Sequence, residues 1–155
     1  MTAQRRRLLF LYGVAAAVYV LDRGTKILAE QHLDGRPPIR LVDDIVHLRF
    51  TTNAGGAFGL FGGQPWLFFG ATVLISAVIV ATSPKVASTL SAVGLGLILG
   101  GALGNLTDRI VRGPGVSGRV VDFIDLRIWP VFNLADSAIV IGAFLVALAA
   151  FRREA

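Results

Sequence analysis

Four long apolar stretches limit what this chain can fold into more than any other feature of its sequence. They cover approximately residues 8–28, 65–82, 86–106 and 131–151. Each is close to the ~20 residues that a helix needs to cross about 30 Å of hydrocarbon. With 54% hydrophobic residues, the chain also lacks the polar surface of a soluble domain. We therefore predict one integral membrane domain over residues 1–155, mainly α, with four transmembrane helices.

The first stretch admits a second interpretation. Arg5, Arg6 and Arg7 followed by an apolar run are also typical of a cleaved secretory signal. Removal of this segment would leave an odd number of spans and would strand the polar residues that follow it. We therefore interpret residues 8–28 as a span.

The residue types exclude several kinds of site. The sequence has no cysteine, which excludes disulfides, thiolate catalysis and cysteine-bound metal, and only His32 and His47 remain as imidazole ligands. We therefore expect no metal and no cofactor. The net charge of +5 comes from basic residues that are scattered or that flank the apolar stretches. We attribute this charge to membrane orientation and expect no nucleic-acid partner.

The basic residues also predict how the chain crosses the membrane. Three very short segments are dense in them: residues 5–7, Lys85, and Arg152 with Arg153. The other nine basic residues are spread over two longer segments, residues 22–64 and 107–130, so a raw count of six against nine points the other way. Density in short segments is the better guide, because the positive-inside rule is strongest there. We expect both termini in the cytoplasm.

With four crossings, the two long connections, residues 29–64 and 107–130, lie on the same extracytoplasmic face. Apolar and polar residues alternate over residues 46–51, which predicts a strand in a small sheet that lies on the membrane. The glycine-rich residues 53–59 are suited to a turn or a backbone platform. The second connection, which contains Gly113-Pro114-Gly115, is predicted to be a loop.

Small residues recur at every fourth position of the third apolar stretch. They are Ser88, Ala92, Gly96, Gly100 and Gly104. A stripe of small side chains lets another helix backbone approach closely. We interpret the stripe as a helix-packing surface.

Two aspartates, Asp122 and Asp136, flank the beginning of the last apolar stretch. Carboxylates at the edge of hydrocarbon are costly, so they are candidates for function. Two carboxylates within about 3 Å cannot both ionise, so they share a proton and can act on water as acid and base. Asp125 is a competitor, but a strand would place it on the opposite face from Asp122. Asn133 and Asp136 also form a plausible helix-capping pair, although that role does not account for Asp122.

Two further groups of polar residues have both a structural and a functional interpretation. Asn105, Asp108 and Arg109 share one helical face, either as a local Asp108/Arg109 pair or as donors for a substrate. Asp22 and Lys26 have the spacing of a stabilising helical ion pair.

Three rival functions remain open at this point. Lys26 with Ser117 or Ser137 would form a Ser/Lys catalytic dyad. Asp122 and Asp136 would serve a small proton-coupled transporter or channel as a relay. A structural four-span protein would use its polar residues only as helix caps. Because the polar residues gather at one face, a conduction path is disfavoured.

Five motifs, in this order and over almost the whole chain, resemble those of the lipoprotein signal peptidase family, bacterial signal peptidase II. They are Asp22-Arg23-Gly24-Thr25-Lys26, Asn53-Ala54-Gly55-Gly56-Ala57-Phe58-Gly59, Gly100-Gly101-Ala102-Leu103-Gly104-Asn105-Leu106-Thr107-Asp108-Arg109, Val120-Val121-Asp122-Phe123 and Phe132-Asn133-Leu134-Ala135-Asp136. One departure is Gly56, where the family often has alanine.

The resemblance implies an aspartic endopeptidase of the bacterial inner membrane. It would remove the signal peptide of a prolipoprotein, cutting just before a cysteine that carries diacylglyceryl. The implied partners are this lipid-modified signal peptide and membrane lipids, held in the bilayer plane by the glycine-striped helices, and we expect a monomer. The implied fold adds a small periplasmic sheet after the first helix and a short periplasmic helix before the last.

The resemblance also assigns roles to individual residues. Asp122 and Asp136 would be the catalytic pair. The substrate-positioning residues would be Asn53, Asn105, Arg109 and Asn133. The supporting residues would be Asp22, Lys26 and Asp108.

Overall fold

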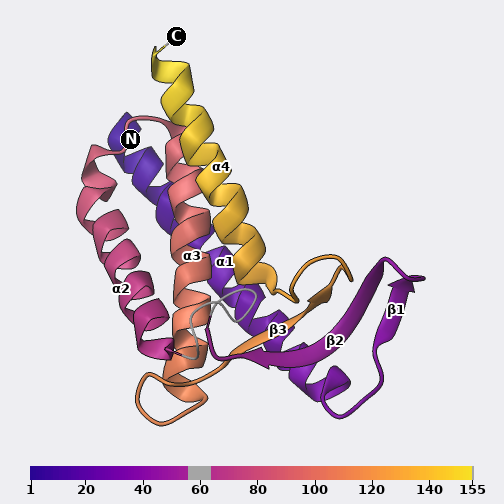
Figure 1. Ribbon diagram of the computed structural model, residues 1–155. Coiled ribbons are helices and arrows are strands. Elements are labelled where there is room, and N and C mark those ends of the chain that lie inside the picture. Colours follow the sequence, from indigo (N-terminus) through magenta and orange to yellow (C-terminus); the bar gives the residue numbers. More distant parts are fainter. Residues whose placement is uncertain (56–63, 155) are drawn as a thin grey trace.

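The computed structural model describes residues 1–55 and 64–154 of the chain. Its helices are α1 (Ala3–Leu33), α2 (Pro65–Thr82), α3 (Thr89–Val111) and α4 (Leu134–Glu154). All four are long and apolar enough to cross a membrane, as predicted. Both termini lie at one end of the helix bundle, and a sheet lies at the other end (Figure 1). The structure does not describe residues 56–63, so residues 56–59 of the predicted glycine-rich turn lie outside the described residues.

α2 begins and ends as predicted, but the other three helices do not coincide with their apolar stretches. α1 continues to Leu33, beyond the predicted end near residue 28, since its polar residues are buried against neighbours. α3 begins only at Thr89, after a short 3-10 turn, η2 (Ser83–Lys85). Ser88 caps it by accepting a 3.0 Å hydrogen bond from the backbone N–H of Ser91.

The sheet has three antiparallel strands in the order β1 (Ile39–Val42), β2 (Val46–Asn53) and β3 (Val120–Asp125). β2 confirms the strand predicted from the alternation over residues 46–51. β3 corrects the prediction for the second connection, which contributes a strand and contains no helix before α4. The run of β-branched and aromatic residues in β3 favours an extended chain, and pairing with β2 satisfies its backbone. The sheet therefore joins the two long connections.

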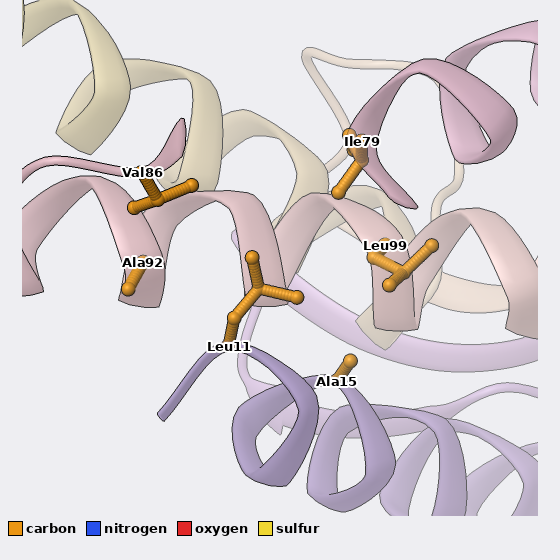
Figure 2. Close-up of a cluster of buried hydrophobic side chains, with 6 residues drawn as sticks. All are labelled: Leu11, Ala15, Ile79, Val86, Ala92 and Leu99. Atoms are coloured by element: carbon orange, nitrogen blue, oxygen red, sulfur yellow. The ribbon is translucent and has the colours of Figure 1, made fainter. Parts of the chain in front are cut away.

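A small apolar core holds the bundle together at the end that carries the termini. Figure 2 shows Leu11, Ala15, Ile79, Val86, Ala92 and Leu99 converging from α1, α2, α3 and, for Val86, the connection between η2 and α3. Outside this core, much of the apolar surface of the helices is exposed, as expected for helices that face lipid.

The glycine stripe of α3 lies directly against α1. A Cβ atom at Gly96 or Gly100 would lie 2.5 Å from the carbonyl oxygen of Leu11 or Ala15, respectively. On another face, a Cβ at Gly101 would lie 2.5 Å from the carbonyl oxygen of Ala135 in α4. The predicted packing role is therefore confirmed. The expectation that the glycine-striped helices hold the substrate stays a prediction.

We expect Gly100→Ala to lower the thermal unfolding temperature in detergent. The new methyl group would collide with the backbone of α1, and such overpacking costs about 1–3 kcal/mol. Gly13→Ala is the matched control, because a Cβ at Gly13 meets no atom within 4 Å. This control should keep or slightly raise the unfolding temperature, since alanine favours a helix more than glycine. Equal temperatures for the two variants would contradict the packing role.

Candidate active site

Asp122 lies in the middle of β3, opposite Thr51 of β2. Its neighbours Val121 and Phe123 pack against Ala29 and Leu33 at the end of α1. Because successive side chains of a strand point to opposite faces, Asp122 is directed away from this packing and into a cavity. Only 2% of its surface is exposed.

Asp136 lies in the first turn of α4 and takes part in the predicted helix cap. The backbone N–H of Asp136 donates to Asn133 Oδ1 over 2.9 Å, and the N–H of Asn133 donates to Asp136 Oδ2 over 3.3 Å. This reciprocal arrangement is a capping box and confirms the structural interpretation. Asn133 also donates from Nδ2 to Asp122 Oδ1 over 2.7 Å, so the same cap reaches the other aspartate.

Asn105 of α3 provides a second bridge between the two carboxylates. Its Nδ2 donates to Asp136 Oδ1 over 2.9 Å. Its Oδ1 accepts hydrogen bonds from Asn133 Nδ2 over 3.2 Å and from Lys26 Nζ over 2.8 Å. Because lysine is only a donor, Lys26 orients the Asn105 amide with its nitrogen toward Asp136. The structure thus joins Asp122 and Asp136 through two buried amides.

A cavity of about 320 Å³ opens above this network. Its lining residues are Asn53, Phe68, Thr72, Ile75, Ile98, Ala102, Asn105, Arg109, Val120, Asp122, Trp129, Pro130, Val131, Phe132, Asp136 and Ile139. Apart from Thr72 of α2, the polar members come from the sheet and from the adjoining ends of α3 and α4. The apolar members come largely from α2, α3, α4 and the chain that precedes α4. The cavity therefore combines an apolar wall with two carboxylates.

Arg109 brings a buried cation to the wall of the cavity. It is 7% exposed, and its Nη1 donates to the carbonyl oxygen of Asn105 over 3.2 Å. Its guanidinium lies 5.9 Å from the ring centroid of Phe68, within the range of a cation–π contact. Among the described residues, no group accepts a hydrogen bond from its Nε. Arg109 therefore places a buried cation with an unsatisfied donor beside the cavity.

The environment of Asp122 favours its protonated form. Burial, followed by the nearby charge of Asp136, raises the pKa of Asp122 from 3.8 to about 7. Hydrogen bonds from Asn133 and Asn53 oppose this rise. One aspartate of the pair therefore holds a proton near neutral pH.

Asp125, the competitor considered from the sequence, belongs to a different group. Its Oδ2 accepts a 2.7 Å hydrogen bond from Arg49 Nε, and its Oδ1 accepts one from the Arg127 N–H over 2.8 Å. Burial opposes ionisation, but these two donors hold the pKa of Asp125 below its ordinary value. Asp125 does not line the cavity.

The predicted supporting residues gather beside the cavity without lining it. Lys26 lies 2.8 Å from Asp22 Oδ2 and 3.1 Å from Asp108 Oδ2, with all three side chains fully buried. The predicted helical pair of Asp22 and Lys26 is confirmed. The local pairing of Asp108 with Arg109 is wrong, because the ion pairs of Asp108 are with Arg23, Lys26 and Arg112.

The predicted Ser/Lys dyads are not assembled. Ser117 Oγ donates to the carbonyl oxygen of Pro114 over 2.8 Å, and Ser137 Oγ donates to that of Asn133 over 3.1 Å. Lys26 is occupied by two carboxylates and an amide. In the part of the chain that the structure describes, no three His, Cys, Asp or Glu side chains converge as a metal site.

Some of the functional residues were not predicted from the sequence. The pairing of Arg112 with Asp108 had a signal, because the two are four residues apart on one helix. Arg23, on a different helix, and Phe68, beneath Arg109, carried no signal that separates them from other residues of their type.

Comparison with known proteins identifies the family. Residues 14–152 match the family described as signal peptidase (SPase) II. The chain belongs to the signal peptidase II family. It is 47% identical over 146 residues to the lipoprotein signal peptidase of Rhodococcus jostii, which covers 94% of this chain and 73% of that protein. It is also 47% identical over 155 residues to the lipoprotein signal peptidase of Streptomyces coelicolor, with 97% and 74% covered.

Solved structures agree with this membership. One described as a bacterial membrane enzyme has a TM-score of 0.80 and 30% identity, and covers 92% of this chain and 87% of that chain. A second has a TM-score of 0.75 and 31% identity, with 88% of each chain covered. As a signal peptidase II, the chain is a membrane protease that removes signal peptides from prolipoproteins, and the transporter alternative is not favoured.

We expect Asp122→Asn to stabilise this signal peptidase at pH 8. The unfolded chain loses the Asp122 proton near pH 3.8 and the folded chain only near pH 7, so the stability of the wild type falls between these values. Asparagine keeps the acceptor for Asn133 and carries no charge. The thermal unfolding temperature of the variant should exceed that of the wild type above pH 7, and the gap should shrink toward pH 4.

Asp125→Asn is the matched control for this measurement. Because the pKa of Asp125 is lowered on folding, its carboxylate contributes stability above its ordinary pKa that is lost as the pH falls. Asp125→Asn should therefore lower the unfolding temperature at pH 8. A stabilised Asp125→Asn or a destabilised Asp122→Asn would contradict the assigned environments.

Proposed function

We propose that this signal peptidase is an aspartic endopeptidase in which Asp122 and Asp136 jointly activate water. The observation that carries the proposal is the bridging of the two carboxylates by Asn105 and Asn133 at the wall of a cavity. A pair with this arrangement can hold one proton and provide both an acid and a base.

The surroundings of the two carboxylates favour different roles for them. Asp136 accepts hydrogen bonds from Asn105 Nδ2 and from the Asn133 N–H, at the positive end of the α4 dipole. These donors suit a carboxylate that acts as the base. Asp122, whose pKa is raised to about 7, is the acid that begins the cycle protonated.

In the proposed reaction, Asp136 takes a proton from water as its oxygen attacks the scissile carbonyl carbon. Asp122 donates its proton to the carbonyl oxygen, which gives a tetrahedral diol. Asp136 then returns its proton to the leaving nitrogen while Asp122 takes one from the diol, and the C–N bond breaks. The enzyme regains its starting protonation, with one water consumed.

The remaining lining residues are suited to hold an extended peptide next to this pair. Arg109 offers its unpaired Nε, and Asn53 and Asn105 offer amide groups. Ile75 of α2 and Ile139 of α4 form part of the apolar wall of the cavity. A signal peptide would therefore approach from the bilayer between these two helices. The substrate is a prolipoprotein that is cut before its diacylglyceryl cysteine.

The location follows from the distribution of charge. Basic residues stand at the beginning of α1, in η2 and near the end of α4. Figure 1 shows that these parts of the bundle lie at the end that carries the termini, remote from the sheet. By the positive-inside rule this end is cytoplasmic. We place the enzyme in the bacterial inner membrane as a monomer, with the sheet and Asp122 at the extracytoplasmic face.

The central test is cleavage of a diacylglyceryl-modified precursor by purified variants. Asp122→Asn and Asp136→Asn should each lower kcat by at least about 1,000-fold, because each loses one proton-transfer group. Asp44→Asn, the same chemical change at an exposed site, should cleave like the wild type. Substantial cleavage by either of the first two variants would exclude the aspartic mechanism. Activity that survives there but is lost in Lys26→Ala and Ser137→Ala would favour the Ser/Lys alternative.

The pH dependence of cleavage tests the assignment of the acid. Above about pH 7 Asp122 loses the proton that it must donate, so kcat should fall about tenfold for each further pH unit. The measurement is single-turnover cleavage between pH 5 and 9, with Asp44→Asn as a control that keeps the wild-type profile. A rate that rises through pH 7 would show that Asp122 must be ionised.

A further inference from the structure

Lys26 lies at the centre of a buried charge cluster that does not line the catalytic cavity. Its Nζ contacts Asp22 Oδ2 at 2.8 Å and Asp108 Oδ2 at 3.1 Å, and donates to Asn105 Oδ1 over 2.8 Å. The side chains of Lys26, Asp22 and Asp108 have no exposed surface. A charge in such a place is tolerated only when it is paired, so the three groups depend on one another.

Each of the two carboxylates of this cluster holds a particular backbone N–H. Asp108 Oδ2 accepts a 3.2 Å hydrogen bond from the N–H of Val121, the residue before Asp122. Asp22 Oδ1 accepts a 3.0 Å hydrogen bond from the N–H of Ala135, the residue before Asp136. The cluster therefore contacts the chain immediately before both members of the catalytic pair.

Each of these two N–H groups depends on its carboxylate to hold the segment beside a catalytic aspartate in place. The Ala135 N–H is in the first turn of α4, where backbone donors have no partner within the helix. The peptide unit that follows Val121 is held on its other side, because the Val121 carbonyl accepts from Asn133 Nδ2 over 3.2 Å. Loss of either carboxylate would leave a buried donor unpaired and free the segment beside a catalytic aspartate.

We propose that Asp22, Lys26 and Asp108 are positioning residues that set the separation of the Asp122 and Asp136 carboxylates. Lys26 is paired with both supporting carboxylates at once, although Asp108 also pairs with Arg23 and Arg112. Lys26 thus connects β3 and the beginning of α4 to a single point on α1. Through Asn105 it also orients one of the amides between the catalytic groups. This inference rests on the proposed aspartic mechanism and extends it to residues that do not contact the substrate.

The two oxygens of Asp22 have separate tasks, which makes the proposal testable. Oδ2 forms the ion pair with Lys26 at 2.8 Å. Oδ1 alone holds Ala135. Asp22→Asn keeps an oxygen for Ala135, whereas Asp22→Leu has a similar volume and no acceptor.

The test compares the kinetics of these two variants with a diacylglyceryl-modified precursor. A displacement of about 1 Å at a catalytic group costs on the order of 100-fold in rate, so Asp22→Leu should lower kcat by about that factor. Its KM should stay within about twofold, because Asp22 does not touch the substrate. Asp22→Asn should keep kcat within about fivefold of the wild type, since the hydrogen bond to Ala135 remains.

Glu30→Gln is the matched control. It removes a charge from the same helix, at an ion pair with Arg112 that holds neither backbone N–H, and should leave kcat unchanged. Wild-type kcat in Asp22→Leu, an Asp22→Asn as slow as Asp22→Leu, or a rise in KM without a fall in kcat would each overturn the proposal. Failure of the aspartic mechanism is separate, because it would appear as cleavage by Asp122→Asn.

Hydrogen exchange provides a second readout if Asp22→Leu does not fold. In Lys26→Gln, the backbone amides of Val121 and Ala135 should both exchange at least about tenfold faster than in the wild type, because a shared constraint has been weakened. Glu30→Gln should leave both rates unchanged. Wild-type protection of both amides in Lys26→Gln, or faster exchange at only one of them, would overturn the proposal.

Discussion

The end of the bundle that carries the sheet depends on the contacts of one buried group, the ammonium of Lys26. A lone cation at the edge of hydrocarbon is costly, so it persists only because Asp22, Asp108 and Asn105 surround it. Those three groups are in turn fixed in position by the same cation. α1 and α3 are thereby joined by charge at one end of the bundle and by apolar packing at the other (Figure 2). Both long connections then meet this charged end, one through β3 and the other through β2.

Close helix packing is what allows these short polar side chains to meet. Gly100 lets α3 approach the backbone of α1, and Gly104 lies directly against the carboxylate of Asp22. A larger side chain at either position would push the helices apart, and aspartate and asparagine are too short to bridge a wider gap. The glycine stripe and the charge cluster are therefore parts of one arrangement. Apolar surface alone would not favour it, because lipid solvates apolar helices as well as a neighbouring helix does.

The sequence predicted the membrane spans well because hydrocarbon thickness imposes a length that composition reveals. It also predicted that Asp122 and Asp136 would lie at one end, since four crossings place both long connections together. It did not predict β3, because pairing with β2 across a long sequence separation has no local signature. The ends of α1 and α3 were misplaced for a related reason. Asp22 and Asp108 look like helix-ending polar residues until their partners on another helix are known.

Asn133 shows why structural and catalytic interpretations of the same residue are not alternatives here. Its side chain caps α4, holds the carbonyl of Val121 and donates to Asp122. The cap places Asp136 at a helix end that favours negative charge, while burial and that same charge keep Asp122 protonated. The two acids thus differ in environment because one of them belongs to a helix cap. Burying Asp122 costs free energy, and the contacts at this end of the bundle offset that cost. Asp22, Asp108 and Lys26 there leave the chain beside Asp122 and Asp136 little freedom to relax. A site that must keep two carboxyl groups together needs this rigidity, because a looser scaffold would let them move apart.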